Sequence, residues 1–152
     1  MSKVSAIQLN SGPNVKVNLY DVKTFIEQIA DLGSKMVVLP ENFALMPEND
    51  ADYIKHAEDL GDGQIQNYLS DLASSYKIWI VGGTIPIKSK DKDRVMASTI
   101  TYNEKGEQVS LYDKIHLFDV TLPKSNESYN ESKYFMPGDK IEVIDTPIGR
   151  AG

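Results

Sequence analysis

The most constraining feature of this sequence is a strand–helix–strand pattern near its start. Residues 4–10 (VSAIQLN) are mostly apolar on both alternating faces, which predicts a largely buried strand. Apolar residues then recur at helical spacing over residues 17–32, and Gly33 suits the end of that helix. Residues 35–40 (KMVVLP) contain a short, continuous apolar run, typical of a strand buried on both faces. This βαβ unit predicts two parallel strands with a right-handed crossover.

The later elements alternate in a similar way. We expect helices over residues 50–58 and 64–76, and strands over residues 78–85, 95–102, 108–112 and 141–144. Residues 103–106 have the composition of a hairpin turn, and the segment 121–138 is polar. The fold class is therefore α/β, one domain with a mixed sheet and helices on one side. The bare face of such a sheet needs a cover, from another chain or from more of this one.

Composition excludes several function classes. The 16 basic residues are scattered among 22 acidic ones, for a net charge of −6, so we expect no nucleic-acid partner. No apolar run approaches the length of a membrane span, and residues 1–10 do not form a signal peptide, so we expect a cytoplasmic protein. The sequence contains no Cys, and its two His, His56 and His116, lie far apart, so we expect no metal site and no cofactor.

Glu41 is the first candidate for chemistry. It follows Pro40 at the carboxyl end of a predicted parallel strand, the edge where open α/β sheets bind ligands. Partial burial beside apolar neighbours would raise the pKa of its carboxyl group and make it a plausible general base. The alternative is an ordinary exposed acid in a strand-to-loop transition, which is the commoner outcome for such a pattern.

Two further candidates lie in the second half of the chain: the segment 112–119, which contains Lys114 and His116, and the single residue Glu131. Lys114 follows a predicted strand and could stabilise negative charge on a substrate oxygen, although a surface ion pair with Asp113 or Asp119 is the commoner arrangement. His116 is more typical of a packed, hydrogen-bonded histidine than of a catalyst. Glu131, considered alone, is typical of a loop acid.

Together these motifs resemble the nitrilase, or carbon-nitrogen hydrolase, superfamily. The similarity extends over VSAIQLN, VVLPE, IWIVGGTIP, YDKIHLFDV, ESKYFMPGD and VIDTPIGRAG, in order and essentially along the whole chain. It looks strongest toward the branch that holds ω-amidases and deaminated-glutathione amidases. The resemblance implies the N-terminal half of a four-layer αββα sandwich, so that residues 1–152 would be a partial domain. The family also usually associates at a sandwich edge, which leaves a homo-oligomer open.

The resemblance also implies roles for individual residues. Glu41 of the LPE motif would be the general base, Lys114 of KIHLFD would stabilise the tetrahedral intermediate, and Glu131 would be a second active-site glutamate that orients the others. The family nucleophile is a Cys on the strand that follows the GRAG-like turn at residues 149–152, and this sequence has none. An amide is attacked by a thiolate that a neighbouring base activates, which Glu41 and Lys114 cannot replace.

The sequence thus predicts part of a metal-free and cofactor-free amidase for a small carboxamide, inactive as these 152 residues alone. A non-catalytic relative that binds or regulates a partner, and an unrelated α/β binding domain, remain as alternatives. The substrate itself stays open, because the loop around residues 121–130 and any missing half would shape the pocket.

Overall fold

The computed structural model describes residues 3–123 and 127–152. Residues 124–126, within the predicted polar segment, lie outside the described residues. The helices are α1 (Val15–Asp31), α2 (Asp52–Lys55), α3 (Gln64–Tyr76) and the short 3-10 helix η1 (Glu131–Lys133). The strands are β1 (Val4–Ala6), β2 (Met36–Val38), β3 (Trp79–Val81), β4 (Ile85–Lys88), β5 (Val95–Tyr102), β6 (Gln108–Asp113), β7 (Asp119–Thr121), β8 (Ser128–Asn130), β9 (Phe135–Met136), β10 (Ile144–Thr146) and β11 (Gly149–Ala151).

A mixed sheet organises the chain, as the sequence predicts. Strands β1, β2 and β3 are parallel neighbours, and β5 continues the sheet antiparallel to β3. Strand β5 also pairs antiparallel with β4 and β6, and in parallel with β9. The first three strands therefore end at the same edge, where the segment after β2 begins.

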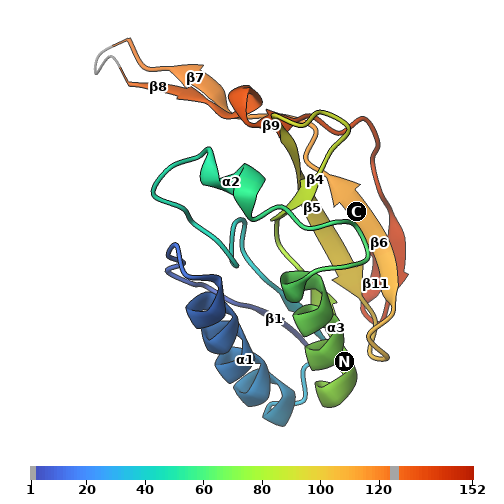
Figure 1. Ribbon diagram of the computed structural model, residues 1–152. Coiled ribbons are helices and arrows are strands. Elements are labelled where there is room, and N and C mark those ends of the chain that lie inside the picture. The colour runs from blue at the N-terminus through green and yellow to red at the C-terminus, as the bar shows by residue number, and fades with distance from the viewer. Residues whose placement is uncertain (1–2, 124–126) are drawn as a thin grey trace.

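Two helices cover one face of this sheet. Asn14 caps the start of helix α1, because its side chain accepts hydrogen bonds from the N–H groups of Lys16 and Val17. Gly33, with a positive φ of 74°, follows the end of the helix. Helices α1 and α3 lie side by side against the sheet (Figure 1). One apolar cluster joins these layers, with Val22, Ile26, Leu69, Ala73, Val37 and Ile80 among its members.

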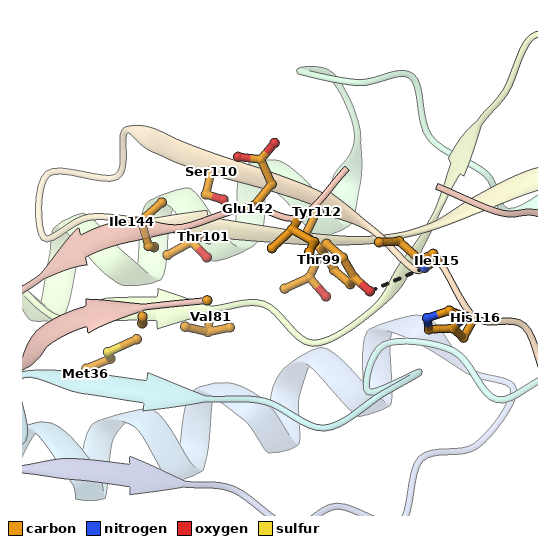
Figure 2. Close-up of a pocket in the computed structure, with 13 residues that line it drawn as sticks. Met36, Val81, Thr99, Thr101, Ser110, Tyr112, Ile115, His116, Glu142 and Ile144 are labelled. Atoms are coloured by element: carbon orange, nitrogen blue, oxygen red, sulfur yellow. Dashed lines mark hydrogen bonds between the residues drawn. The ribbon is translucent and has the colours of Figure 1, made fainter. Parts of the chain in front are cut away.

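The other face of the sheet is partly covered by the C-terminal segment. The antiparallel hairpin of β10 and β11 lies over it, and a cavity of about 580 Å³ remains between them. Figure 2 shows its lining, with Met36 and Val81 from the sheet facing Ile144 of β10. The bare face expected from the sequence is therefore covered here in part by residues 141–152 of the same chain.

Several boundaries predicted from the sequence are wrong. The run 78–85 is two strands, because β3 ends at Val81 and Gly82–Gly83 turn the chain before β4. A side chain at Gly82 would meet the Ile100 carbonyl oxygen at 2.7 Å, so the apolar run hides a close backbone crossing. The first strand is shorter than 4–10, and its Val4 is 41% exposed because β1 is an edge strand.

The C-terminal half also departs from the prediction. The strand expected at 141–144 is β10 at Ile144–Thr146, and the GRAG-like turn at 149–152 instead contains β11. The polar segment 121–138 holds β8, η1 and β9. Here tertiary pairing decides the structure, since β9 gains its partner from β5, far away in sequence.

Candidate active site

Glu41 lies where the sequence predicts, just beyond the carboxyl end of β2. The Leu39 N–H donates to the Val81 carbonyl, 3.0 Å away, and this contact extends the β2–β3 pairing almost to Glu41. The following residues Phe43, Ala44 and Leu45 are buried. The Glu41 side chain itself is 56% exposed, so this carboxylate is held at the surface by a backbone that is anchored on both sides.

Lys114 directly follows β6, and its backbone is fixed from two directions. Its N–H donates to the Ala97 carbonyl at 2.9 Å, and its carbonyl accepts from the Gly138 N–H at 2.9 Å. Gly138 approaches so closely that a Cβ there would lie 2.2 Å from the Asp113 carbonyl oxygen. Only glycine permits this approach, which brings the segment after β9 against the start of the Lys114 loop.

Glu131 opens the 3-10 helix η1 and faces the same point. Its side chain is 17% exposed, and its Oε2 atom accepts a hydrogen bond from the Phe118 N–H at 2.5 Å. The Glu131 N–H donates in turn to the Phe118 carbonyl, at 3.4 Å. A backbone N–H therefore holds this carboxylate in place, independently of its contact with the Lys114 side chain.

The three predicted residues meet at one ammonium group. Lys114 Nζ lies 2.9 Å from Glu41 Oε1, 2.9 Å from Glu131 Oε2 and 3.0 Å from Glu131 Oε1. Burial tends to lower the pKa of Lys114, but the hydrogen bonds and charges of Glu41 and Glu131 outweigh it, so this pKa lies above its ordinary value. Lys114 therefore remains a cation throughout the neutral range and can offer its N–H donors to a substrate oxygen.

The alternatives for Lys114 and His116 turn out differently from the sequence-based interpretation. Lys114 pairs with the distant Glu41 and Glu131, whereas Asp113 accepts from the Ser98 hydroxyl and Asp119 from the Ser132 N–H. His116 is exposed and lines the cavity beside the sheet (Figure 2) instead of packing in the core. None of the three clustered residues lines that cavity, although Ile115 and His116, which follow Lys114 in the sequence, do.

Tyr53 forms part of the apolar support of the site. It belongs to α2 and packs in a cluster with Leu45 and Phe135, with its ring centroid 4.9 Å from that of Phe135. Burial, followed by the charges of Asp50, Glu41 and Glu131, raises the pKa of Tyr53 to about 12. The sequence reasoning missed this residue, because an aromatic side chain in a short helix carries no distinguishing pattern.

Comparison with known proteins decides the family. The sequence pattern of the carbon-nitrogen hydrolase family matches residues 3–152. The chain belongs to the carbon-nitrogen hydrolase family. A deaminated glutathione amidase of Yersinia enterocolitica is 38% identical over 152 residues, which is 99% of this chain and 52% of that protein. An omega-amidase of Saccharomyces cerevisiae is 36% identical, over 99% of this chain and 53% of its own length.

Solved structures of other proteins share the fold. The NitFhit protein of C. elegans has a TM-score of 0.86 at 27% identity, and the match covers 99% of this chain and 37% of that one. A member of branch 10 of the nitrilase superfamily from Saccharomyces cerevisiae has a TM-score of 0.76 at 33% identity, over 93% of this chain and 49% of that one. The chain thus spans about half the length of the curated relatives it matches.

The described residues contain neither a metal-binding cluster nor a membrane-spanning helix. No cluster of three or more His, Asp or Glu side chains suited to a metal ion occurs in residues 3–123 and 127–152. Within the same ranges, no helix has the length and apolarity needed to cross a bilayer. At the candidate site, the carboxylates of Glu41 and Glu131 both pair with Lys114.

Proposed function

We propose that this protein provides the general base and the oxyanion-stabilising cation of an amidase that hydrolyses a small carboxamide. One observation carries the proposal: a single ammonium group, Lys114 Nζ, lies within 3.0 Å of both Glu41 and Glu131. Thiol-dependent amide hydrolysis requires two groups besides its nucleophile. One is a carboxylate that can accept a proton, and the other is a cation that can stabilise the developing oxyanion.

In the proposed mechanism, Glu41 takes the proton of a cysteine thiol, and the thiolate forms a bond to the amide carbon. The amide oxygen becomes negatively charged and is stabilised by Lys114, which exchanges one of its two contacts with Glu131 for this oxygen. Collapse of the intermediate breaks the C–N bond. Glu41 gives its proton to the leaving nitrogen, which departs as ammonia. Water then attacks the thioester carbon while Glu41 takes a proton from it, the C–S bond breaks to release the carboxylic acid, and Glu41 returns the proton to the thiolate.

The three residues have distinct positions in this scheme. Glu41 is the more exposed carboxylate and has room to exchange protons with a nucleophile and a leaving group. Glu131 is the more buried one, and its bond from the Phe118 N–H suits a group that holds Lys114 in place. We assign Glu41 as general base, Lys114 as oxyanion stabiliser and Glu131 as the second glutamate that orients Lys114.

The nucleophile has to come from outside these 152 residues, because the sequence has no Cys. We therefore propose that residues 1–152 are part of one carbon-nitrogen hydrolase domain and have no turnover alone. The similarity to a deaminated glutathione amidase and an omega-amidase supports a carboxamide at the end of a small acid as substrate. A cytoplasmic location suits such a metabolite.

The test combines an intact mass with an activity assay. The protein is isolated from its source cells, its mass is measured, and ammonia release from small ω-carboxamides is followed. We expect release only from a form heavier than 16.9 kDa that reacts with a thiol reagent. Ammonia release by a 16.9-kDa preparation would contradict the thiol mechanism, and a thiol-containing form that releases none would contradict the amidase proposal.

A further inference from the structure

The Glu41 carboxylate is placed almost entirely by its backbone. Its side chain is 56% exposed, and its carboxylate forms an ion pair with Lys114. The flanking residues Leu39 and Phe43 are 3% and 0% exposed, so both sides of the turn are fixed in the core. The direction of the Glu41 side chain therefore depends on how the chain turns between these two buried residues.

That turn has an unfavourable backbone conformation at Asn42. Its φ of 53° lies in the left-handed region, which L residues other than glycine seldom occupy, although Asn tolerates it better than most. Such a conformation persists only where surrounding contacts determine it. The contact in this structure is specific: the Asn42 N–H donates to the Thr84 Oγ1 atom at 2.8 Å.

Thr84 can reach the turn because Gly83 precedes it. Gly83 has a φ of 55°, and a Cβ at this position would lie 2.0 Å from the Pro40 carbonyl oxygen. The segment after β3 therefore packs directly against the residue before Glu41. The Thr84 hydroxyl also lies 3.4 Å from Asn42 Oδ1, so both the backbone and the side chain of Asn42 face it.

We propose that Thr84 is a positioning residue for Glu41, because its hydroxyl fixes the left-handed turn at Asn42 that directs the Glu41 carboxylate to Lys114. Thr84 acts through Asn42 and does not touch the reacting atoms. The inference concerns the geometry of Glu41 and holds whether or not the protein is an amidase. Only its consequence for turnover rests on the proposed function.

The test compares Thr84→Val, which keeps the shape of the side chain but removes the hydroxyl, with Thr84→Ser, which keeps the hydroxyl. The readout is the titration of the Lys114 ammonium group, followed by NMR of its Cε and Nζ nuclei. Because Glu41 helps to raise this pKa, Glu41→Gln defines the value expected when the contact is lost. We expect Thr84→Val to move the Lys114 pKa down toward that value, and Thr84→Ser to retain the wild-type pKa.

Thr24→Val is the matched control. In the wild-type protein, the Thr24 hydroxyl donates an exposed hydrogen bond to the Tyr20 carbonyl within α1. The same chemical change at this position should therefore leave the Lys114 titration unaffected. A wild-type Lys114 titration in Thr84→Val, or a loss in Thr84→Ser equal to that in Thr84→Val, would overturn the proposal.

A measurement on the unmodified protein covers the case in which Thr84→Val does not fold. We expect the Asn42 amide proton to exchange with solvent at least about tenfold more slowly than in an open chain. Exchange at the open-chain rate would show that the bond to Thr84 is absent and would also overturn the proposal. If the protein releases ammonia, Thr84→Val lowers kcat by about tenfold or more, since small misplacements of catalytic groups are costly. Absence of ammonia release counts against the amidase alone, because the titration and exchange do not depend on it.

Discussion

Glu41 and Glu131 share one ammonium group but are held in opposite ways. Glu131 is 17% exposed, contacts Lys114 through both oxygens and accepts the Phe118 N–H. Glu41 is 56% exposed and reaches Lys114 through one oxygen. The difference shows how one cation can serve two acids: a fixed carboxylate orients it, while an exposed carboxylate stays free to change its partner and its protonation. Stability should therefore depend on Glu131 and chemistry on Glu41.

Removal of the shared cation breaks the comparison altogether and has the largest expected effect. If the protein releases ammonia as proposed, Lys114→Met should lower kcat/KM by about a thousandfold, because the proposed oxyanion would lose its charged donor. It also leaves the mostly buried Glu131 carboxylate without its cationic partner. The measurement is the rate of ammonia release under subsaturating substrate.

Lys88→Met provides the control for that substitution. Lys88 pairs with Asp59 at 2.7 Å, and both side chains are more than half exposed, so it tests the loss of a surface ion pair alone. Equal losses in the two variants would contradict the role of Lys114.

The arrangement around Lys114 also shows what a sequence can and cannot predict. The βαβ unit and the position of Glu41 follow from apolar runs and strand order, which are local signals. The roles of Lys114 and Glu131 were predicted from the family resemblance, because the local pattern alone favours an ion pair of Lys114 with its neighbour Asp113 or Asp119. The real partner Glu41 lies 73 residues away, a distance that no local pattern spans.

Two other features, a backbone hydrogen bond to Glu131 and the break between β3 and β4, could not be predicted from the side chains. The Phe118 N–H that holds Glu131 is a backbone group, which any residue would supply. The break between β3 and β4 at Gly82–Gly83 lies within a run that reads as one apolar strand. Both features depend on a close approach of distant backbone segments, and their positions are set by the tertiary fold.

Gly138→Ala sharpens the comparison by disturbing Lys114 without touching Glu41. An added Cβ would lie 2.2 Å from the Asp113 carbonyl oxygen, which is backbone and cannot move aside cheaply. We expect the free energy of unfolding to fall by about 3 kcal/mol, as for other overpacked sites. Denaturant titration measures this loss.

Gly12→Ala is the matched control for Gly138→Ala. No heavy atom lies within 4 Å of a Cβ built at Gly12, so the substitution should change the free energy of unfolding by about 0.5 kcal/mol or less. A similar loss at both glycines would mean that the approach of Gly138 to Asp113 is not what the alanine disturbs.

The pKa of Tyr53 is sensitive to the charges of both carboxylates. Its pKa is raised to about 12, mainly by burial and then by Asp50, Glu41 and Glu131. The neutral phenol is therefore favoured in the folded protein, and its contribution is present below the unfolded pKa of about 10 and lost as pH rises toward 12. Tyr53→Phe should reduce the alkaline loss of unfolding free energy between these pH values by on the order of 2 kcal/mol.

Tyr20→Phe is the control for this pH dependence, since Tyr20 is 67% exposed on α1. Its unfolding free energy should follow the wild-type curve. A Tyr53→Phe curve that also follows the wild type would show that the Tyr53 hydroxyl titrates alike in the folded and unfolded chains.

The direct comparison of the two acids has the smallest effect on stability and is the most informative. Glu131→Gln keeps an acceptor for the Phe118 N–H but loses the charge that faces Lys114, and we expect it to lower the free energy of unfolding by roughly 1 to 2 kcal/mol. Glu41→Gln should change it by about 0.5 kcal/mol or less, because an exposed ion pair contributes little. Denaturant titrations of both variants at neutral pH give these values. If Glu41→Gln lowers the free energy of unfolding as much as Glu131→Gln does, then the exposed carboxylate is as firmly held as the buried one. That result would contradict the assignment of Glu131 as the residue that orients Lys114 and of Glu41 as the free base.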